Sequence, residues 1–148
     1  MEISSLLKML LKFAVFVMCV LGTTGFMFND PCNVFPQYSG GIPDSLDFTT
    51  DVNVPATCRN GTFRWDYPRG HSMVMFHNLH RTPTKICIRD ALGGQVFTIT
   101  DMTNNKQIGA FDEKTWACTD VTSAQEITLK IDAPEELRYM GEVEYKLV

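Results

Sequence analysis

Four cysteines, separated by intervals of about thirty residues, most constrain the fold of this chain: Cys32, Cys58, Cys87 and Cys118. A fifth, Cys19, lies in residues 1–25, which have the form of a secretion signal: a short charged start, nine apolar residues at positions 13–21, then small residues. Nine apolar residues are too few to cross a bilayer, which needs roughly 20. We therefore expect residues 1–25 to be cleaved, leaving an even number of cysteines in an oxidising compartment.

The charge of the mature chain argues against nucleic-acid binding. Removing residues 1–25 takes Lys8, Lys12 and Glu2 from the 13 basic and 17 acidic residues, which leaves 11 basic and 16 acidic residues. The remaining Lys and Arg are scattered, whereas a phosphate backbone requires a basic stripe. No second apolar stretch of membrane length follows the leader, so we expect a freely secreted product with no membrane insertion after cleavage.

The alternation of apolar and polar residues predicts short strands separated by turns. Seven or eight segments have this character: residues 63–67, 73–76, 86–88, 95–101, 107–111, 115–118, 127–131 and 143–147. Residues 73–76 are continuously apolar, which predicts a strand buried on both faces. Residues 26–57 are rich in Pro, Gly and Asp and are predicted to be a loop-dominated lead-in. The pattern indicates one all-β domain over residues 26–148, an antiparallel sandwich or barrel.

Four cysteines permit three disulfide connectivities, and their spacing alone does not choose among them. We favour the sequential pairing, Cys32 with Cys58 and Cys87 with Cys118, because it would tie the lead-in to the first strong strand and join two later strands. On the chain-entropy model each disulfide would stabilise the fold by roughly 3.5 kcal/mol. A zinc site is the alternative use of these cysteines, but the chain contains no C-x-x-C pair to support it.

The segment from Cys58 to Gly70, CRNGTFRWDYPRG, resembles the meteorin family, whose N-terminal domain contains a similar strand ending in Trp-x-Tyr-Pro-x-Gly. Further similarities are the apolar strand at residues 73–76, the motif around Cys87, the lone Cys118 and the closing strand at residues 143–147. The resemblance implies a CUB-like, disulfide-stapled β-sandwich that acts as a secreted signalling ligand for a cell-surface protein. Meteorins continue into a second, netrin-like module, and this chain stops at Val148.

Other functions fit the same architecture. One alternative is an adhesion or carbohydrate-binding protein similar to the single-CUB spermadhesins, and another is a venom component or an inhibitor. An enzyme is not expected, because the usual nucleophile, metalloprotease and nucleotide-binding motifs are absent from the sequence. No cofactor is expected, and the sequence does not predict an oligomeric state.

Candidate surface residues come from turn chemistry and from one modification motif. Asn60-Gly61-Thr62 is an N-glycosylation sequon, and Asn60 would face solvent if it carried a glycan. Arg69, in a Pro-Arg-Gly turn, is a candidate contact residue because the turn exposes a fixed charge. Trp65 and Trp116 are candidate recognition anchors, although large aromatic residues are more often part of a core.

Metal binding has little support in the sequence. The resemblance places Asp90 where some CUB domains hold calcium, but the loop at residues 78–84 has no carboxylate, so we interpret Asp90 as a turn aspartate. His71, His77 and His80 lie within ten residues. His71 and His77 should share one face of a strand and His80 should lie in a loop, which does not form a zinc site.

Overall fold

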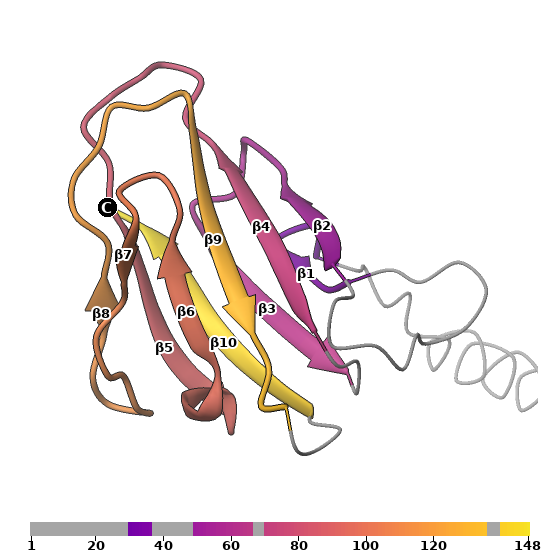
Figure 1. Cartoon of the computed structure of the whole chain (residues 1–148). Helices are drawn as coiled ribbons and strands as arrows, with labels where there is room; N and C mark the ends of the chain where they lie inside the picture. Colours follow the sequence, from indigo (N-terminus) through magenta and orange to yellow (C-terminus); the bar gives the residue numbers. More distant parts are fainter. Residues whose placement is uncertain (1–29, 37–48, 67–69, 136–139) are drawn as a thin grey trace, which may run out of the picture.

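The structure is a computed structural model that describes residues 30–36, 49–66, 70–135 and 140–148, and these residues form two β-sheets packed face to face (Figure 1). Sheet A has the spatial order β1 (Asn33–Val34), β3 (Asn60–Asp66), β10 (Met140–Leu147), β5 (Ile86–Leu92) and β8 (Ala117–Cys118). Sheet B has the order β2 (Thr49–Val54), β4 (His71–His77), β9 (Glu126–Asp132), β6 (Thr98–Asp101) and β7 (Lys106–Gln107). The prediction of a disulfide-stapled all-β sandwich is confirmed. The predicted leader, residues 1–25, lies outside the described residues.

Both sheets are mixed, which corrects the expectation of purely antiparallel pairing. β1 pairs in parallel with β3, and β2 pairs in parallel with β4, while the other strand pairs are antiparallel. The first four strands alternate between the sheets, so the chain passes through the opposite sheet between β1 and β3 and again between β2 and β4. These crossovers permit parallel pairing, because two parallel strands cannot be connected by a tight hairpin.

Two of these strands lie in the segment predicted to be a lead-in. β1 and β2 fall within residues 26–57, so the prediction of a loop-dominated segment is wrong for these two stretches. In β2 only Val52 and Val54 face the core, and the neighbouring positions are exposed. Two apolar residues are too few to make a clear alternation, and the strand is fixed by its pairing with β4 along its whole length.

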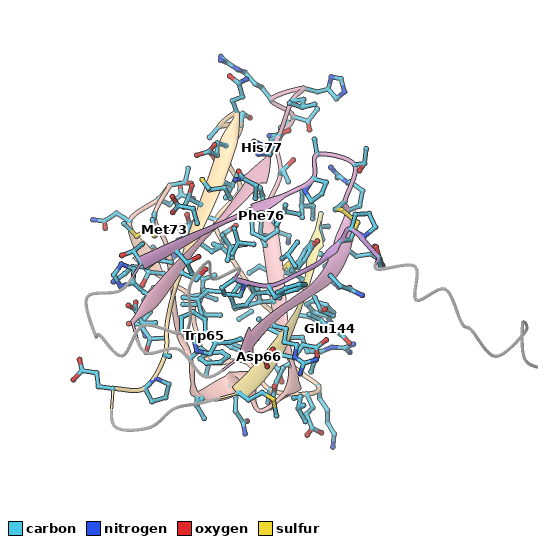
Figure 2. The ribbon with its side chains drawn as sticks, turned by 90° about the vertical axis from the view of Figure 1, so that its right-hand side faces the viewer. Trp65, Asp66, Met73, Phe76, His77 and Glu144 are labelled. Carbon is cyan, nitrogen blue, oxygen red and sulfur yellow. A yellow bond between two sulfur atoms is a disulfide. The ribbon has the colours of Figure 1, made fainter. Side chains whose placement is uncertain are left out.

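The prediction that residues 73–76 are buried on both faces is also wrong. Along β4 the residues facing the core are Ser72, Val74 and Phe76, whereas Met73 and Met75 are only half-buried on the outer face. Figure 2 shows Phe76 between the sheets and Met73 at the outside of sheet B. A flexible methionine can cover a half-exposed surface as well as fill a core, so an apolar run containing methionine does not distinguish these two positions.

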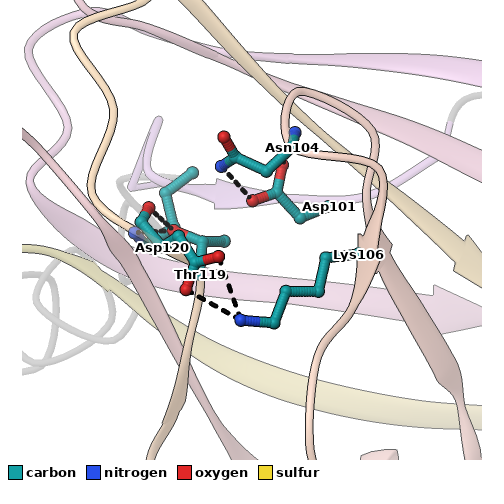
Figure 3. Close-up of polar contacts among 6 residues, drawn as sticks. Asp101, Asn104, Lys106, Thr119 and Asp120 are labelled. Carbon is teal, nitrogen blue, oxygen red and sulfur yellow. Dashed lines mark hydrogen bonds and ion pairs between the residues drawn. The ribbon is translucent and has the colours of Figure 1, made fainter.

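The predicted strands at residues 95–101 and 107–111 are shorter in the structure. A 3₁₀-helical turn, η1 (Gly94–Val96), precedes β6, and β7 contains only Lys106 and Gln107. Gly94 is required here because a Cβ would lie 2.6 Å from a Val143 methyl carbon. Lys106 of β7 contacts both carboxylate oxygens of Asp120 at 2.9 Å, which links the edge of sheet B to the segment following β8 of sheet A (Figure 3).

The sandwich interior and the disulfides hold the two layers in place. The largest fully buried side chains include Trp65 and Phe63 of sheet A and Ile127 and Leu129 of sheet B. Disulfides join Cys32 to Cys58 and Cys87 to Cys118, so the favoured sequential pairing is confirmed. Cys87 and Cys118 lie directly opposite each other in β5 and β8, while the first disulfide joins the segments leading into β1 and β3. Within the described residues, no helix is long and apolar enough to span a membrane.

Candidate binding surface

The outer face of sheet A carries a half-buried aromatic side chain, Trp116, in contact with charged residues. On β10, Val143 and Tyr145 face the core, so Glu144 and Lys146 face outward by alternation. Strand register continues this outer row on the neighbouring strands: Glu144 lies opposite Thr62 of β3 and opposite Arg89 of β5, and Lys146 lies opposite Asn60. We define the Trp116 surface as Asn60, Thr62, Arg89, Trp116, Glu144 and Lys146.

Trp116 is held above the sheet by the turn that precedes it and the disulfide that follows it. The Asp112 carboxylate accepts backbone hydrogen bonds from Lys114 at 2.8 Å and Thr115 at 2.7 Å, which closes this turn. These bonds favour the ionised form and hold the pKa of Asp112 below its usual value. Two residues after Trp116, Cys118 is bonded to Cys87 of β5. The backbone at Trp116 is therefore anchored by the Asp112 turn before it and by the Cys87–Cys118 disulfide after it.

Two cations lie against the Trp116 ring. The Lys146 ammonium is 4.0 Å and the Arg89 guanidinium carbon 4.7 Å from the ring centroid, which are cation–π distances. Arg89 also forms an ion pair with Glu144 through two guanidinium nitrogens that donate to the same carboxylate oxygen. No carboxylate in the described part of the chain pairs with Lys146, so its charge is available to an incoming group.

A hollow of about 390 Å³ opens at this surface, and its walls include Asn60, Thr62, Trp116 and Lys146. Tyr145 also borders the hollow, and its hydroxyl donates a 2.7 Å hydrogen bond to the Cys32 carbonyl oxygen. Burial raises the pKa of Tyr145 to about 12, and the negative charge of Asp30 contributes to the same shift. The Tyr145 side chain itself faces the core, and its hydroxyl ties this part of β10 to the first disulfide.

The other tryptophan lies inside the sandwich, which corrects the expectation that Trp65 is a contact residue. Trp65 is 0% exposed, and its ring lies 6.2 Å from that of Phe63 and 5.8 Å from that of Phe97. It lies on the core side of β3, so its indole is not part of the protein surface. Figure 2 shows Trp65 between the sheets and Glu144 on the outside of sheet A. Arg69, the second predicted contact residue, lies outside the described residues.

The glycosylation sequon is part of the Trp116 surface. Asn60 is exposed at the start of β3, and Thr62 is half-buried two residues later on the same outer face. Gly61 between them faces the first disulfide, where a Cβ would lie 2.0 Å from the Cys32 carbonyl oxygen. The sequon is therefore accessible to solvent on the folded domain, and whether Asn60 carries a glycan stays a prediction.

The metal candidates do not come together. Asp90 lies within β5 and is 4% exposed, so the interpretation as a turn aspartate is wrong. Its carboxylate accepts a 2.6 Å hydrogen bond from the Gly94 backbone N–H and so fixes the turn after β5. His71 and His77 share the outer face of sheet B as expected, where His71 contacts the Thr49 hydroxyl at 2.6 Å. His80 lies in the following loop and is exposed. Among the described residues, no three His, Cys, Asp or Glu side chains are grouped to hold a metal ion.

No family model matches the chain, and no curated protein has significant sequence similarity to it. The residue roles proposed here therefore rest on the geometry of the domain. Sequence reasoning found Trp116 only as one of two undistinguished tryptophans and did not single out Arg89, Glu144 or Lys146. The alternation along the last strand already indicates that Glu144 and Lys146 face outward. Their contact with Trp116 depends on the order of the strands in sheet A, which the sequence does not show.

Proposed function

We propose that this chain is a secreted, non-enzymatic binding module that recognises another extracellular protein through the Trp116 surface. The two disulfides support an oxidising, extracellular setting. Within this proposal residues 1–25 are removed as a signal peptide, and passage through the secretory pathway exposes the Asn60 sequon to N-glycosylation.

The single observation that carries the proposal is the Trp116 ring with its two cations on an open sheet face. Tryptophan and arginine are the residues most enriched among those that dominate binding energy at protein interfaces. The side-chain parts of Arg89 and Glu144 are only about one-third exposed, at 33% and 36%, so they are partly ordered before a partner arrives. Preordering lowers the entropy cost of binding. The resemblance to meteorins adds the expectation that the partner is a cell-surface protein and that binding leads to signalling.

A carbohydrate-binding or adhesion function is the second candidate. The observation that favours it is the hollow itself, where an aromatic ring lies beside the polar side chains of Asn60, Thr62 and Lys146. Such a combination can pack against a sugar ring and hydrogen bond its hydroxyl groups. Glycan-array binding without saturable binding to a protein receptor would favour this alternative.

The test is saturable binding of the oxidised, leader-free protein to a panel of cell types. We expect Trp116→Ala to weaken binding by about 30-fold, the loss associated with a hot-spot residue. Met73→Ala is the matched control because Met73 is half-buried on the outer face of the opposite sheet. Equal binding by Trp116→Ala and the unsubstituted protein, or loss of binding in Met73→Ala alone, would contradict the assignment of this surface.

A further inference from the structure

The sequon and the aromatic ring of the Trp116 surface are brought together only by the fold. Asn60 lies directly opposite Lys146 in the β3–β10 register, and the Lys146 ammonium is 4.0 Å from the centroid of the Trp116 ring. Directly opposite residues of antiparallel strands have Cβ atoms about 5 Å apart. Asn60 and Trp116 also border the same hollow of about 390 Å³. A group attached to the Asn60 amide therefore starts at the rim of the hollow that Trp116 overlooks.

The Asn60 side chain is free to carry such a group. It is exposed, and its amide makes no hydrogen bond to another residue in the described ranges. Thr62, the third residue of the sequon, lies on the same outer face. A glycan here would leave the buried side of β3, which holds Phe63 and Trp65, undisturbed.

We propose that Asn60 carries an N-linked glycan whose first sugar packs in the hollow against Trp116, so that glycosylation and partner binding exclude one another at this surface. The inference rests on the proposed function for the identity of the competing ligand. In the attachment step, the Asn60 amide nitrogen forms a bond to the anomeric carbon of an oligosaccharide donor. The bond from that carbon to the lipid pyrophosphate breaks, the pyrophosphate leaves, and the amide loses one proton.

Three contacts favour packing of the sugar in the hollow over free projection into solvent. Trp116 borders the hollow beside Lys146 and Glu144, which offer a donor and an acceptor to the sugar hydroxyl groups. A bulky glycan held in this position would cover the residues that a protein partner needs. The secreted protein would then exist in a covered, glycosylated form and an open form that lacks the glycan and binds its partner.

Intrinsic fluorescence can test this because the chain has only two tryptophans and Trp65 is 0% exposed. Quenching by acrylamide therefore reports on Trp116. The full chain would be produced in a eukaryotic secretory host, and the glycosylated protein compared with the same protein after enzymatic glycan removal and with Asn60→Gln. We expect the quenching constant to be lower in the glycosylated form by about twofold or more, as a bulky covering group would cause. Trp116→Phe should abolish the difference.

Mass spectrometry of the peptide containing Asn60 and cell binding by each form complete the test. An unmodified Asn60 in the secreted protein, or equal quenching in the glycosylated and Asn60→Gln proteins, would overturn the proposal. Cell binding at least roughly tenfold tighter for the unsubstituted protein produced with N-glycosylation blocked than for the glycosylated form would support mutual exclusion, and equal binding would overturn it. Absence of binding by every form, together with a clear quenching difference, would instead reject the proposed function while the sugar contact with Trp116 stands.

Discussion

The two faces of sheet A each present one of the two tryptophans, and the contacts of these residues differ in kind. Trp65, on the inner face, is fully buried among aromatic rings. Trp116, on the outer face, contacts Lys146 and Arg89 in a half-exposed setting. Burial of a large aromatic side chain contributes several kcal/mol to folding, whereas exposed cation–π contacts contribute about 0.5–1 kcal/mol each. The inner tryptophan therefore contributes more to the stability of the fold than the outer one does.

The largest expected effect separates these two roles directly. Trp65→Ala should lower the free energy of unfolding by about 3–5 kcal/mol, because it leaves a cavity beside Phe63 and Phe97. Trp116→Ala should lower it by only about 1–2 kcal/mol, because it removes two partly exposed cation–π contacts. Urea unfolding followed by far-ultraviolet circular dichroism measures both without depending on tryptophan fluorescence. A similar loss in the two variants would remove the distinction between the faces.

A somewhat smaller effect is expected from the Cys87–Cys118 disulfide, which joins β5 to β8 on the outer face of sheet A. The double variant Cys87→Ala/Cys118→Ala should lose about 3.5 kcal/mol, the chain-entropy cost for a separation of 31 residues. It should also increase acrylamide quenching of Trp116, because β8 pairs with β5 over only two residues and Cys118 follows Trp116 closely. An acrylamide quenching constant that stays the same or falls in the double variant, or unchanged urea unfolding, would show that the disulfide does not hold the Trp116 surface in place.

The smallest effect concerns Tyr145, which connects the inner face to the first disulfide. Tyr145→Phe should cost about 1 kcal/mol near neutral pH, because the 2.7 Å bond to the Cys32 carbonyl oxygen is lost. The pKa of Tyr145 is raised from 10.0 to about 12, so the fold favours the neutral phenol. The stability from this preference is complete below pH 10 and is lost as the pH rises towards 12.

Urea unfolding of the two proteins between pH 8 and pH 12 measures this dependence. Tyr145→Phe should show a smaller loss of stability above pH 10 than the unsubstituted protein, because the titrating phenol is absent. Parallel stability curves for the two proteins across that range would contradict the role assigned to Tyr145.

Strong alternation made much of the fold predictable. Isoleucine and leucine at every second position identified β9. Other apolar residues at every second position identified the core of β3 and the end of β10. β1 and β2 were missed because each offers few apolar residues and gains its hydrogen bonds from distant partners. Met73 and Met75 were misplaced because hydrophobicity alone does not report which face of a strand is covered.

The sequence by itself determined the all-β architecture, the four cysteines available for disulfides and the presence of the Asn60 sequon, because alternation, cysteine count and a three-residue motif are local properties. Only the tertiary structure decided that Trp65 is fully buried and that Trp116 is partly exposed. It also decided that Asn60, Arg89, Trp116 and Lys146 meet on one face. The physical reason is that this meeting depends on the order and register of β3, β10, β5 and β8, which are fixed by burying the inner faces of two sheets against each other.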